Sequence, residues 1–157
     1  MPRIEVVFYR DDDGSVPALE WIEGLPPKAR LKCFVRLGRL RERGHELRRP
    51  EADFLRDGIY ELRVSLNHVQ YRLLYSFSTS KSPHREDDAK VLKPKKSEKM
   101  RSATKGRGEA LSSHQTVAVV AHGITKEAKV PDEEIERALA RMKKFTTDPV
   151  AHTFSED

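Results

Sequence analysis

Charged side chains occupy one face of a predicted β-hairpin over residues 59–77, where two arginines face each other. Period-two alternation places Glu61 and Arg63 on the polar face of its first strand and Arg72 on the polar face of its second. With a two-residue turn at positions 67–68, Arg63 lies directly opposite Arg72. Like charges in that position destabilise a sheet. A sheet that keeps two such guanidinium groups indicates a site for an anion, and phosphate fits the forked geometry of arginine.

The other face of this predicted hairpin is apolar. The side chains that alternation places on it are Tyr60, Leu62, Val64 and Leu66 in the first strand and Val69, Tyr71, Leu73, Tyr75 and Phe77 in the second. Alternation of this kind is typical of a half-buried strand.

Three elements and a loop are predicted before the hairpin. The pattern indicates a strand over residues 4–9, a short helix capped by Ser15 and ended by Gly24, and a longer helix over residues 28–43. Residues 45–58 are predicted as a loop because turn-forming residues punctuate them.

The longer helix, residues 28–43, combines an apolar stripe with a strongly basic outer face. The stripe consists of Leu31, Phe34, Val35, Leu37 and Leu40. The basic face includes Arg36, Arg39 and Arg43. Two interpretations stay open: a surface that binds RNA phosphates or an acidic partner, and a solvated face whose long side chains cover apolar neighbours.

A basic segment interrupts the chain after the hairpin. Residues 78–115 contain 10 Lys and Arg against 5 Asp and Glu, whereas the remainder has 20 of each, so the net charge of +5 resides in this segment. Its composition and lack of periodicity predict a disordered insert, either an arm for RNA or an insertion without function. The global charge therefore supports no claim of nucleic-acid binding.

Two elements follow the insert. Residues 116–121 are apolar on both faces, which predicts a central strand with neighbours on both sides, one of them the hairpin. A helix led by Pro131 follows, and its buried stripe is predicted to consist of Ile135, Ala138, Leu139, Met142 and Phe145. Residues 147–157 are predicted to be a frayed tail, which leaves one domain over residues 1–146 interrupted by the insert.

Composition excludes several classes of site. Cys33 is the only cysteine, so an intrachain disulfide and a multi-cysteine zinc site are excluded, and we expect this side chain to pack a helix. The aspartates at positions 11–13 lack the ligand spacing of a calcium loop, and no metal or other cofactor is expected. No apolar run approaches the length of a membrane span, so a cytoplasmic protein without membrane contact is expected.

The order of the motifs resembles the HigB/RelE superfamily of toxins, in particular its HigB-like, phage-associated branch. The resemblance is carried by Glu61-Leu62-Arg63 on one strand, Tyr71-Arg72-Leu73-Leu74-Tyr75 on the next, and His122-Gly123-Ile124-Thr125-Lys126 before the Pro131-led helix. It implies an α+β fold with a small, mostly antiparallel four-stranded sheet, packed with N-terminal helices and a C-terminal helix.

The same resemblance implies a function. Members are toxins of type II toxin–antitoxin systems that cleave mRNA on the ribosome without a metal, and a cognate antitoxin, often a helix-turn-helix protein, neutralises them. Carried over residue by residue, the catalytic candidates are Glu61, Arg63, Arg72, His122 and Lys126.

The RNA-binding candidates are Tyr71 and Lys129 together with the three arginines of the longer helix. This chain departs from the family pattern at Ile124, where an aromatic residue is usual, and at Glu127, where a second lysine is usual. Lys129 can supply the charge that Glu127 removes.

These residues suit RNA cleavage by attack of the ribose 2′-hydroxyl on the adjacent phosphate. Arg63 and Arg72 would hold the phosphate, Lys126 would add charge, and Glu61 or His122 would move protons, with base and acid unassigned between them. Structural roles are the alternative, because Glu61 can pair with a neighbouring arginine and His122 can be a hydrogen-bonded residue at a strand end. A non-catalytic protein that binds RNA or a regulatory partner is the alternative function.

Overall fold

The computed structural model describes residues 4–80, 115–125 and 129–154. All the elements named below are built from these residues. In chain order they are β1 (Glu5–Phe8), α1 (Pro17–Glu23), α2 (Pro27–Arg43), a 3-10 turn (Gly44–Glu46), β2 (Ala52–Arg56), β3 (Ile59–Leu66), β4 (Val69–Ser80), β5 (Gln115–Thr125) and α5 (Asp132–Thr147). The predicted insert, residues 78–115, lies outside the described residues except at its two ends.

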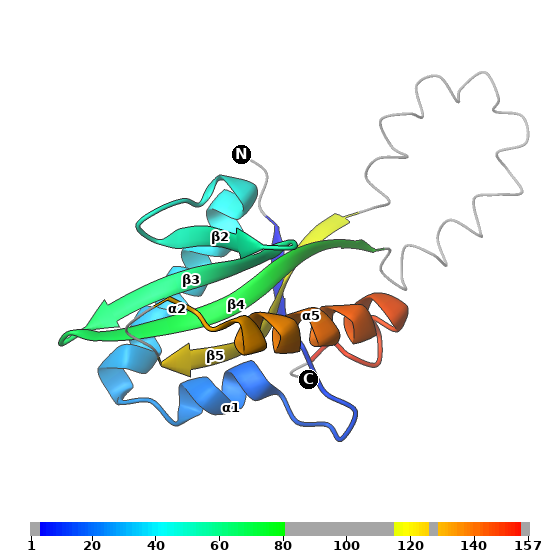
Figure 1. The fold of residues 1–157 in the computed structure, drawn as a ribbon, viewed down its shortest axis with the longest axis horizontal. Coiled ribbons are helices and arrows are strands. Elements are labelled where there is room, and N and C mark those ends of the chain that lie inside the picture. The colour runs from blue at the N-terminus through cyan, green and yellow to red at the C-terminus, as the bar shows by residue number, and fades with distance from the viewer. Residues whose placement is uncertain (1–3, 81–114, 126–128, 155–157) are drawn as a thin grey trace, which may run out of the picture. The chain divides into compact units, whose positions relative to one another are not determined.

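The strands form a mixed five-stranded sheet in the order β1-β5-β4-β3-β2 (Figure 1). The edge strand β1 runs parallel to β5, with Val6 beside Ala118, whereas β2 and β4 are antiparallel to β3. The predicted α+β class is confirmed. The predicted four-stranded sheet is wrong by one strand, while β5 has neighbours on both sides, as its apolar faces predicted.

The missing strand is β2, which occupies part of the predicted loop over residues 45–58. Its sequence, Ala52–Arg56, lacks clean alternation, and its pairing with β3 shifts register between Phe54 and Arg56. A tight turn joins it to β3, with positive φ angles of 52° at Asp57 and 84° at Gly58. An edge strand this short is stabilised by its partner more than by its own sequence, which is why the pattern did not reveal it.

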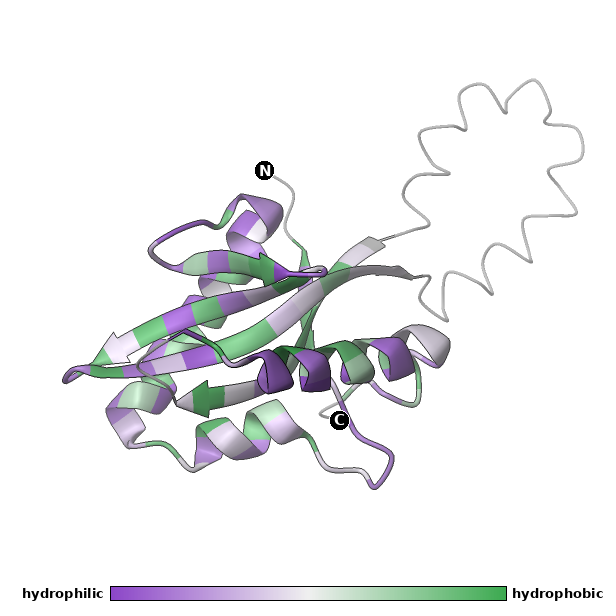
Figure 2. Cartoon of the chain, in the orientation of Figure 1, coloured by the Kyte–Doolittle hydropathy of each residue, from purple (hydrophilic) through white to green (hydrophobic). Residues whose placement is uncertain are grey.

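The predicted register of the β3–β4 hairpin is confirmed. Arg63 lies opposite Arg72, and the turn residues Asn67 and His68 have φ angles of 52° and 68°. Left-handed conformations at both positions match the twist of the flanking strands in a two-residue hairpin. Along β3, hydrophobic and hydrophilic residues alternate visibly (Figure 2).

Helices cover the two faces of the sheet. One core cluster joins α1 and α2 to the predicted apolar face of the hairpin, including Leu62, Val64 and Leu73. On the other face, α5 packs against Ile59 and Leu74 (Figure 1). The charged residues of the hairpin therefore share their face with α5.

The buried side of α2 differs from the predicted stripe. The helix buries Ala29, Cys33, Leu37 and Leu40. Leu31, Phe34 and Val35 are instead exposed by 64%, 46% and 59%. Two helical stripes were compatible with this sequence, and the one with small residues allows the closer approach to the sheet. Cys33 packs as predicted, and burial raises the pKa of its thiol to about 11.

The N-terminus of α1 also differs from the prediction. Val16, not Ser15, is the N-cap residue. The Ser15 hydroxyl donates to Asp13 Oδ1 at 2.7 Å, and the Val16 N–H donates to Glu20 Oε2 at 3.3 Å. The hydrogen bond to the Val16 N–H therefore comes from a side chain within the first turn of the helix.

Residues 148–154 are packed, contrary to the predicted frayed tail. The Phe154 N–H donates to the Phe8 carbonyl at 2.9 Å, and the His152 ring stacks on Tyr9 with centroids 5.4 Å apart. Backbone pairing along the free edge of β1 compensates for the polar sequence of this segment. Within the described residues, no helix has the length and apolarity to span a bilayer.

Gly123 of β5 lies against the indole ring of Trp21 from α1. A Cβ atom at this position would overlap three ring carbons of Trp21. The glycine in the His-Gly motif is therefore required by packing between the sheet and α1. Gly38, in the interior of α2, has open space where a Cβ would lie.

We predict that Gly123→Ala lowers the free energy of unfolding by about 1–3 kcal/mol, because the added methyl group overpacks the contact with Trp21. Adding Trp21→Leu should recover part of that loss by making room. Gly38→Ala is the matched control and should be neutral or slightly stabilising, since alanine favours an exposed helix. Urea unfolding gives the free energy of unfolding of the wild type and of the three variants. A Gly123→Ala variant as stable as Gly38→Ala would contradict the packing explanation.

Candidate functional site

The charged face of the hairpin is organised around the Glu61 carboxylate. Arg72 Nη1 donates to Glu61 Oε1 at 2.6 Å, and Arg63 Nε lies 3.5 Å from Glu61 Oε2. Glu61 and Arg72 are only 3% and 6% exposed, whereas the Arg63 side chain is 33% exposed. The carboxylate thus offsets the repulsion between the facing arginines, and Arg63 is the one whose charge reaches solvent.

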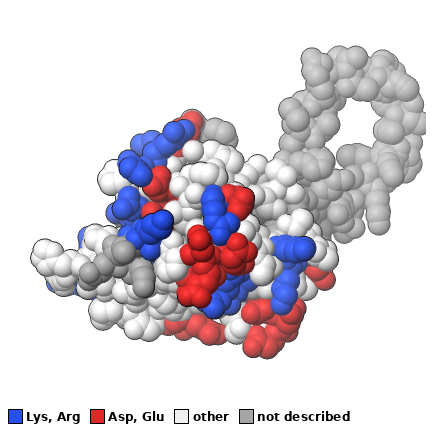
Figure 3. Space-filling model, viewed as in Figure 1, with Lys and Arg blue, Asp and Glu red and all other residues white. Residues whose placement is uncertain are grey.

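These three side chains line a hollow of about 400 Å³. The other lining residues are Arg49, Asp53, Leu55, Lys129 and Val130. Four cations and two carboxylates meet there, so the hollow carries an excess of positive charge. Lys and Arg gather over β2 and β3 on this face, whereas Asp and Glu gather over the first turns of α5 (Figure 3).

Register and pairing bring the β2 residues into the site. Asp53 lies opposite Glu61 across the β2–β3 pair, and Arg49 Nη2 and Nε donate to Asp53 Oδ2 at 2.8 and 3.0 Å. Hydrogen bonding from Arg49 lowers the pKa of the Asp53 carboxyl. Asp53 is therefore ionised at neutral pH and is a weak proton acceptor. Sequence reasoning missed both residues because it assigned no strand there.

Arg56 links β2 to the acidic start of α5. Its Nη2 atom lies 2.9 Å from Glu136 and 3.6 Å from Asp132. Two carboxylates beside the hollow are thereby partly neutralised. These ion pairs join the end of β2 to the end of α5 that follows Lys129 and Val130.

His122 is not among the residues that line the hollow. Its Nε2 atom lies 3.0 Å from Glu134 Oε1, and its Nδ1 atom is buried without a hydrogen-bond partner in the described part of the chain. Burial, reinforced by the positive charge of Arg141, lowers the pKa of His122 to about 4, although Glu134 opposes the shift. The imidazole is therefore neutral at pH 7, and the predicted alternative of a hydrogen-bonded residue on this strand describes its contacts.

A break in alternation explains the direction of His122. Ala121 packs in the α5-side cluster, His122 contacts Glu134 of α5, and Gly123 faces Trp21 of α1. Two consecutive residues thus face α5, as occurs at a β-bulge. No pattern in the sequence located this irregularity.

The remaining predicted residues are divided among several places. Lys126 lies outside the described residues, whereas Lys129 lines the hollow. Tyr71 is 6% exposed on the opposite face, where its ring meets Trp21 edge-on at 6.2 Å. The structure therefore does not bring Tyr71 to the cationic face.

The three arginines of α2 differ in their surroundings. Arg36 and Arg63 line a neighbouring hollow of about 370 Å³, so Arg36 adjoins the site through Arg63. Arg39 is engaged by Glu51, with two hydrogen bonds of 3.0 and 3.1 Å. Arg43 is exposed in the last turn. Of these three, Arg36 is placed to extend a surface for phosphate.

Among residues 4–80, 115–125 and 129–154, no three His, Cys, Asp or Glu side chains are grouped in a way that could hold a metal ion. What the described hollow offers is guanidinium donors, an ammonium group and two carboxylates, a set that binds an anion and stabilises developing negative charge.

Comparison with protein families gives a match to part of the chain. Residues 20–83 match the family described as Phage derived protein Gp49-like (DUF891). The match covers less than half of the chain and includes Glu61, Arg63 and Arg72 but not His122 or Lys129. No curated protein matches the chain.

We predict that acid destabilises the wild-type protein more than a His122→Gln variant. The folded state holds the pKa of His122 near 4, below its ordinary value of 6.5, so only the unfolded chain binds this proton between those pH values. Stability should therefore fall as pH drops through that window. Between pH 7 and 4.5 the wild type should lose about 2 kcal/mol more than the variant in urea unfolding.

Carboxylates are present in both proteins, so their contribution largely cancels in this difference. Equal losses in the two proteins would show that the protonation of His122 is not linked to folding.

Proposed function

We propose that this chain is the toxin of a type II toxin–antitoxin system of the HigB/RelE superfamily and that it cleaves mRNA in the cytoplasm, on the ribosome. The observation that carries the proposal is the hollow that Arg49, Arg63, Arg72 and Lys129 line together with Glu61. The motif order supports it, as does the match of residues 20–83 to a phage-derived family. Each support is independent of the protein's net charge.

The reaction we propose is transfer of the phosphate within the RNA. The ribose 2′-oxygen attacks the adjacent phosphorus, the bond to the 5′-oxygen breaks, and a 2′,3′-cyclic phosphate and a 5′-hydroxyl result. A proton leaves the 2′-hydroxyl and one joins the leaving oxygen. The protein must mainly stabilise the additional negative charge of the pentavalent transition state, and this requires no cofactor.

Arg63 is the residue we assign to the phosphate oxygens. Its side chain is one-third exposed, and the Glu61 contact orients it without covering it. Arg72 is buried against Glu61, so it would act through the positive potential and by holding that carboxylate. Lys129, at the edge of the hollow, would add charge at a second oxygen.

Glu61 is the proton acceptor that we favour. Of the two candidates from the sequence, Glu61 lines the hollow, whereas His122 contacts Glu134 of α5. Asp53 is disfavoured because Arg49 lowers its pKa. Because Glu61 is hydrogen-bonded to Arg72, we assign most of the rate enhancement to charge stabilisation by the cations of the hollow.

The neutralising partner we propose is a small helix-turn-helix antitoxin that places an acidic, amphipathic segment on α2. Leu31, Phe34 and Val35 form an exposed apolar patch there, and the exposed Lys28 and Lys32 flank it. Exposed apolar surface rimmed by charge of one sign marks an interaction site for a partner of opposite sign.

We expect Arg63→Ala to lower the rate of mRNA cleavage in a cell-free translation reaction by about 10²–10³-fold, the effect of losing one donor to a developing oxyanion. Arg63→Lys should retain part of the activity. Lys143→Ala removes an exposed cation from the last turns of α5 and is the control. Arg72→Ala is a poorer test, because breaking a buried pair costs about 3–5 kcal/mol of stability.

Mapping of RNA ends by primer extension reads out this experiment. Wild-type protein that folds and yet produces no new ends on translated mRNA would refute the endonuclease proposal. Retained binding of RNA or of a partner would then favour the non-catalytic regulator.

For the antitoxin, we predict that a Leu31→Asp/Phe34→Asp variant still arrests growth but is no longer rescued by co-expression of a helix-turn-helix antitoxin that neutralises the wild type. Acidic residues would repel an acidic partner segment, weakening binding at least about tenfold. Val150→Asp, at an exposed apolar residue of the C-terminal segment, is the control. Rescue of the double variant at wild-type levels would place the antitoxin elsewhere.

A further inference from the structure

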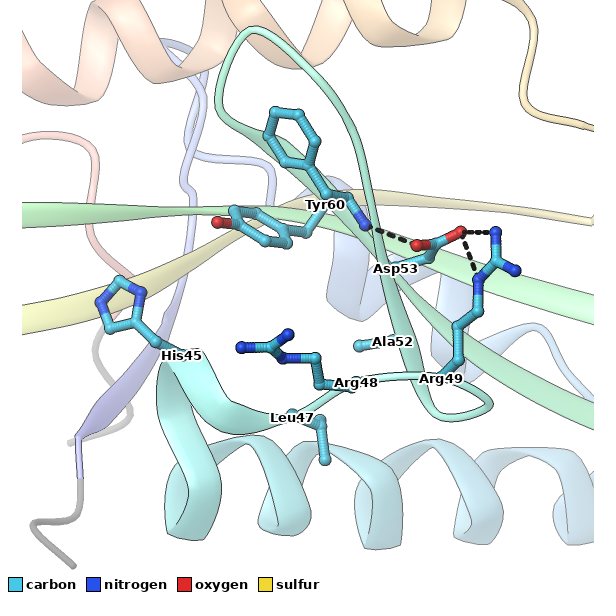
Figure 4. Close-up of a pocket in the computed structure, with 8 residues that line it drawn as sticks. His45, Leu47, Arg48, Arg49, Ala52, Asp53 and Tyr60 are labelled. Atoms are coloured by element: carbon cyan, nitrogen blue, oxygen red, sulfur yellow. Dashed lines mark hydrogen bonds and ion pairs between the residues drawn. The ribbon is translucent and has the colours of Figure 1, made fainter.

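A second hollow, of about 460 Å³, lies on the other side of the edge strand β2 from the cationic one (Figure 4). It is lined by His45, Leu47, Arg48, Arg49, Ala52, Asp53, Phe54 and Tyr60. Arg49 and Asp53 line both hollows. The two spaces therefore adjoin across the edge of the sheet, where no further strand covers β2.

The walls of this second hollow are aromatic. Phe54 lies opposite Tyr60 in the β2–β3 register, and their rings meet edge-on with centroids 5.1 Å apart. Tyr60 in turn stacks on Tyr75 at 5.4 Å. The His45 ring lies against Phe77, with centroids 3.8 Å apart. These contacts hold the rings in place, so a flat ligand would meet a preformed surface.

Phe54 is unusually open for a phenylalanine. It is 52% exposed, although Tyr75 behind its partner ring is only 1% exposed. Exposure of a large ring costs hydrophobic free energy unless another group covers it.

A cation completes the hollow. The Arg48 side chain extends into the space between His45 and Tyr60 (Figure 4). Within the described part of the chain, no hydrogen bond or ion pair engages its guanidinium, whereas Arg49 next to it is tied to Asp53. A planar cation and aromatic rings around one space are the groups on which nucleic-acid bases stack.

We infer that this second hollow binds a nucleobase of single-stranded RNA, from a nucleotide adjoining the phosphate held in the cationic hollow. The inference rests on the proposed function and adds the path of the strand, which crosses the β2 edge at Arg49 and Asp53. The base stacks on Phe54, and Arg48 contacts its other side or its phosphate. Aromatic stacking tolerates every base, so this subsite sets affinity and position rather than sequence preference.

The test is fluorescence anisotropy with a labelled 2′-O-methyl RNA oligonucleotide, which lacks the attacking hydroxyl and so is not cleaved, and with a matched oligonucleotide of abasic residues. Phe54→Leu should weaken binding of the base-containing oligonucleotide about fivefold or more, and binding of the abasic one by less than twofold. Val150→Ala shortens an exposed apolar side chain that lines neither hollow, and it should alter neither binding.

Arg48→Gln is a second, independent variant and keeps the inference testable if Phe54→Leu unfolds. This substitution should weaken the binding of base-containing RNA more than the binding of abasic RNA. If both variants fold and each binds the two oligonucleotides as the wild type does, the base subsite is overturned. Cleavage of mRNA by the wild type would then still support the proposed function. If the wild type neither binds RNA nor cleaves it, the proposed function fails, and the base subsite fails with it.

Discussion

The charged face of the sheet depends on the ion pairs that the buried Glu61 carboxylate makes with Arg72 and Arg63. Register forces Arg63 and Arg72 to lie opposite each other, and the turn at Asn67 and His68 fixes that register. Without a negative charge between them, two guanidinium groups on neighbouring strands would repel. Glu61 pairs closely with Arg72 and more loosely with Arg63. One arginine is thereby structural, and the other is oriented toward solvent.

The same arrangement explains why the two sides of the sheet have different tasks. The side that faces α1 and α2 carries the larger core, whereas α5 covers its side only in part and leaves the hairpin charges open beside its N-terminus. An edge strand, β2, borders both spaces. Arg49 and Asp53, which an ion pair holds at that border, are therefore available from either side.

Much of the hairpin could be predicted because alternation and a two-residue turn determine which residues face each other. Other features depend on packing and pairing between distant segments, which no local sequence pattern predicts. The α2 sequence has two stripes at helical spacing, and packing against the sheet selected Ala29 and Cys33 over Leu31 and Phe34. A break in β5 turned His122 toward Glu134. The strand at β2, with Asp53, forms because β3 offers it partners.

The topology has a consequence for the order in which the chain can fold. β5 is the last strand in the sequence, yet it lies between β4 and the first strand, β1. Until β5 is synthesised, β1 has no strand beside it, and the β2–β4 meander lacks the rest of its sheet. Lys129 and Val130, which close the cationic hollow, come later still. A nascent chain emerging from the ribosome therefore carries its arginines before the residues that complete their binding site.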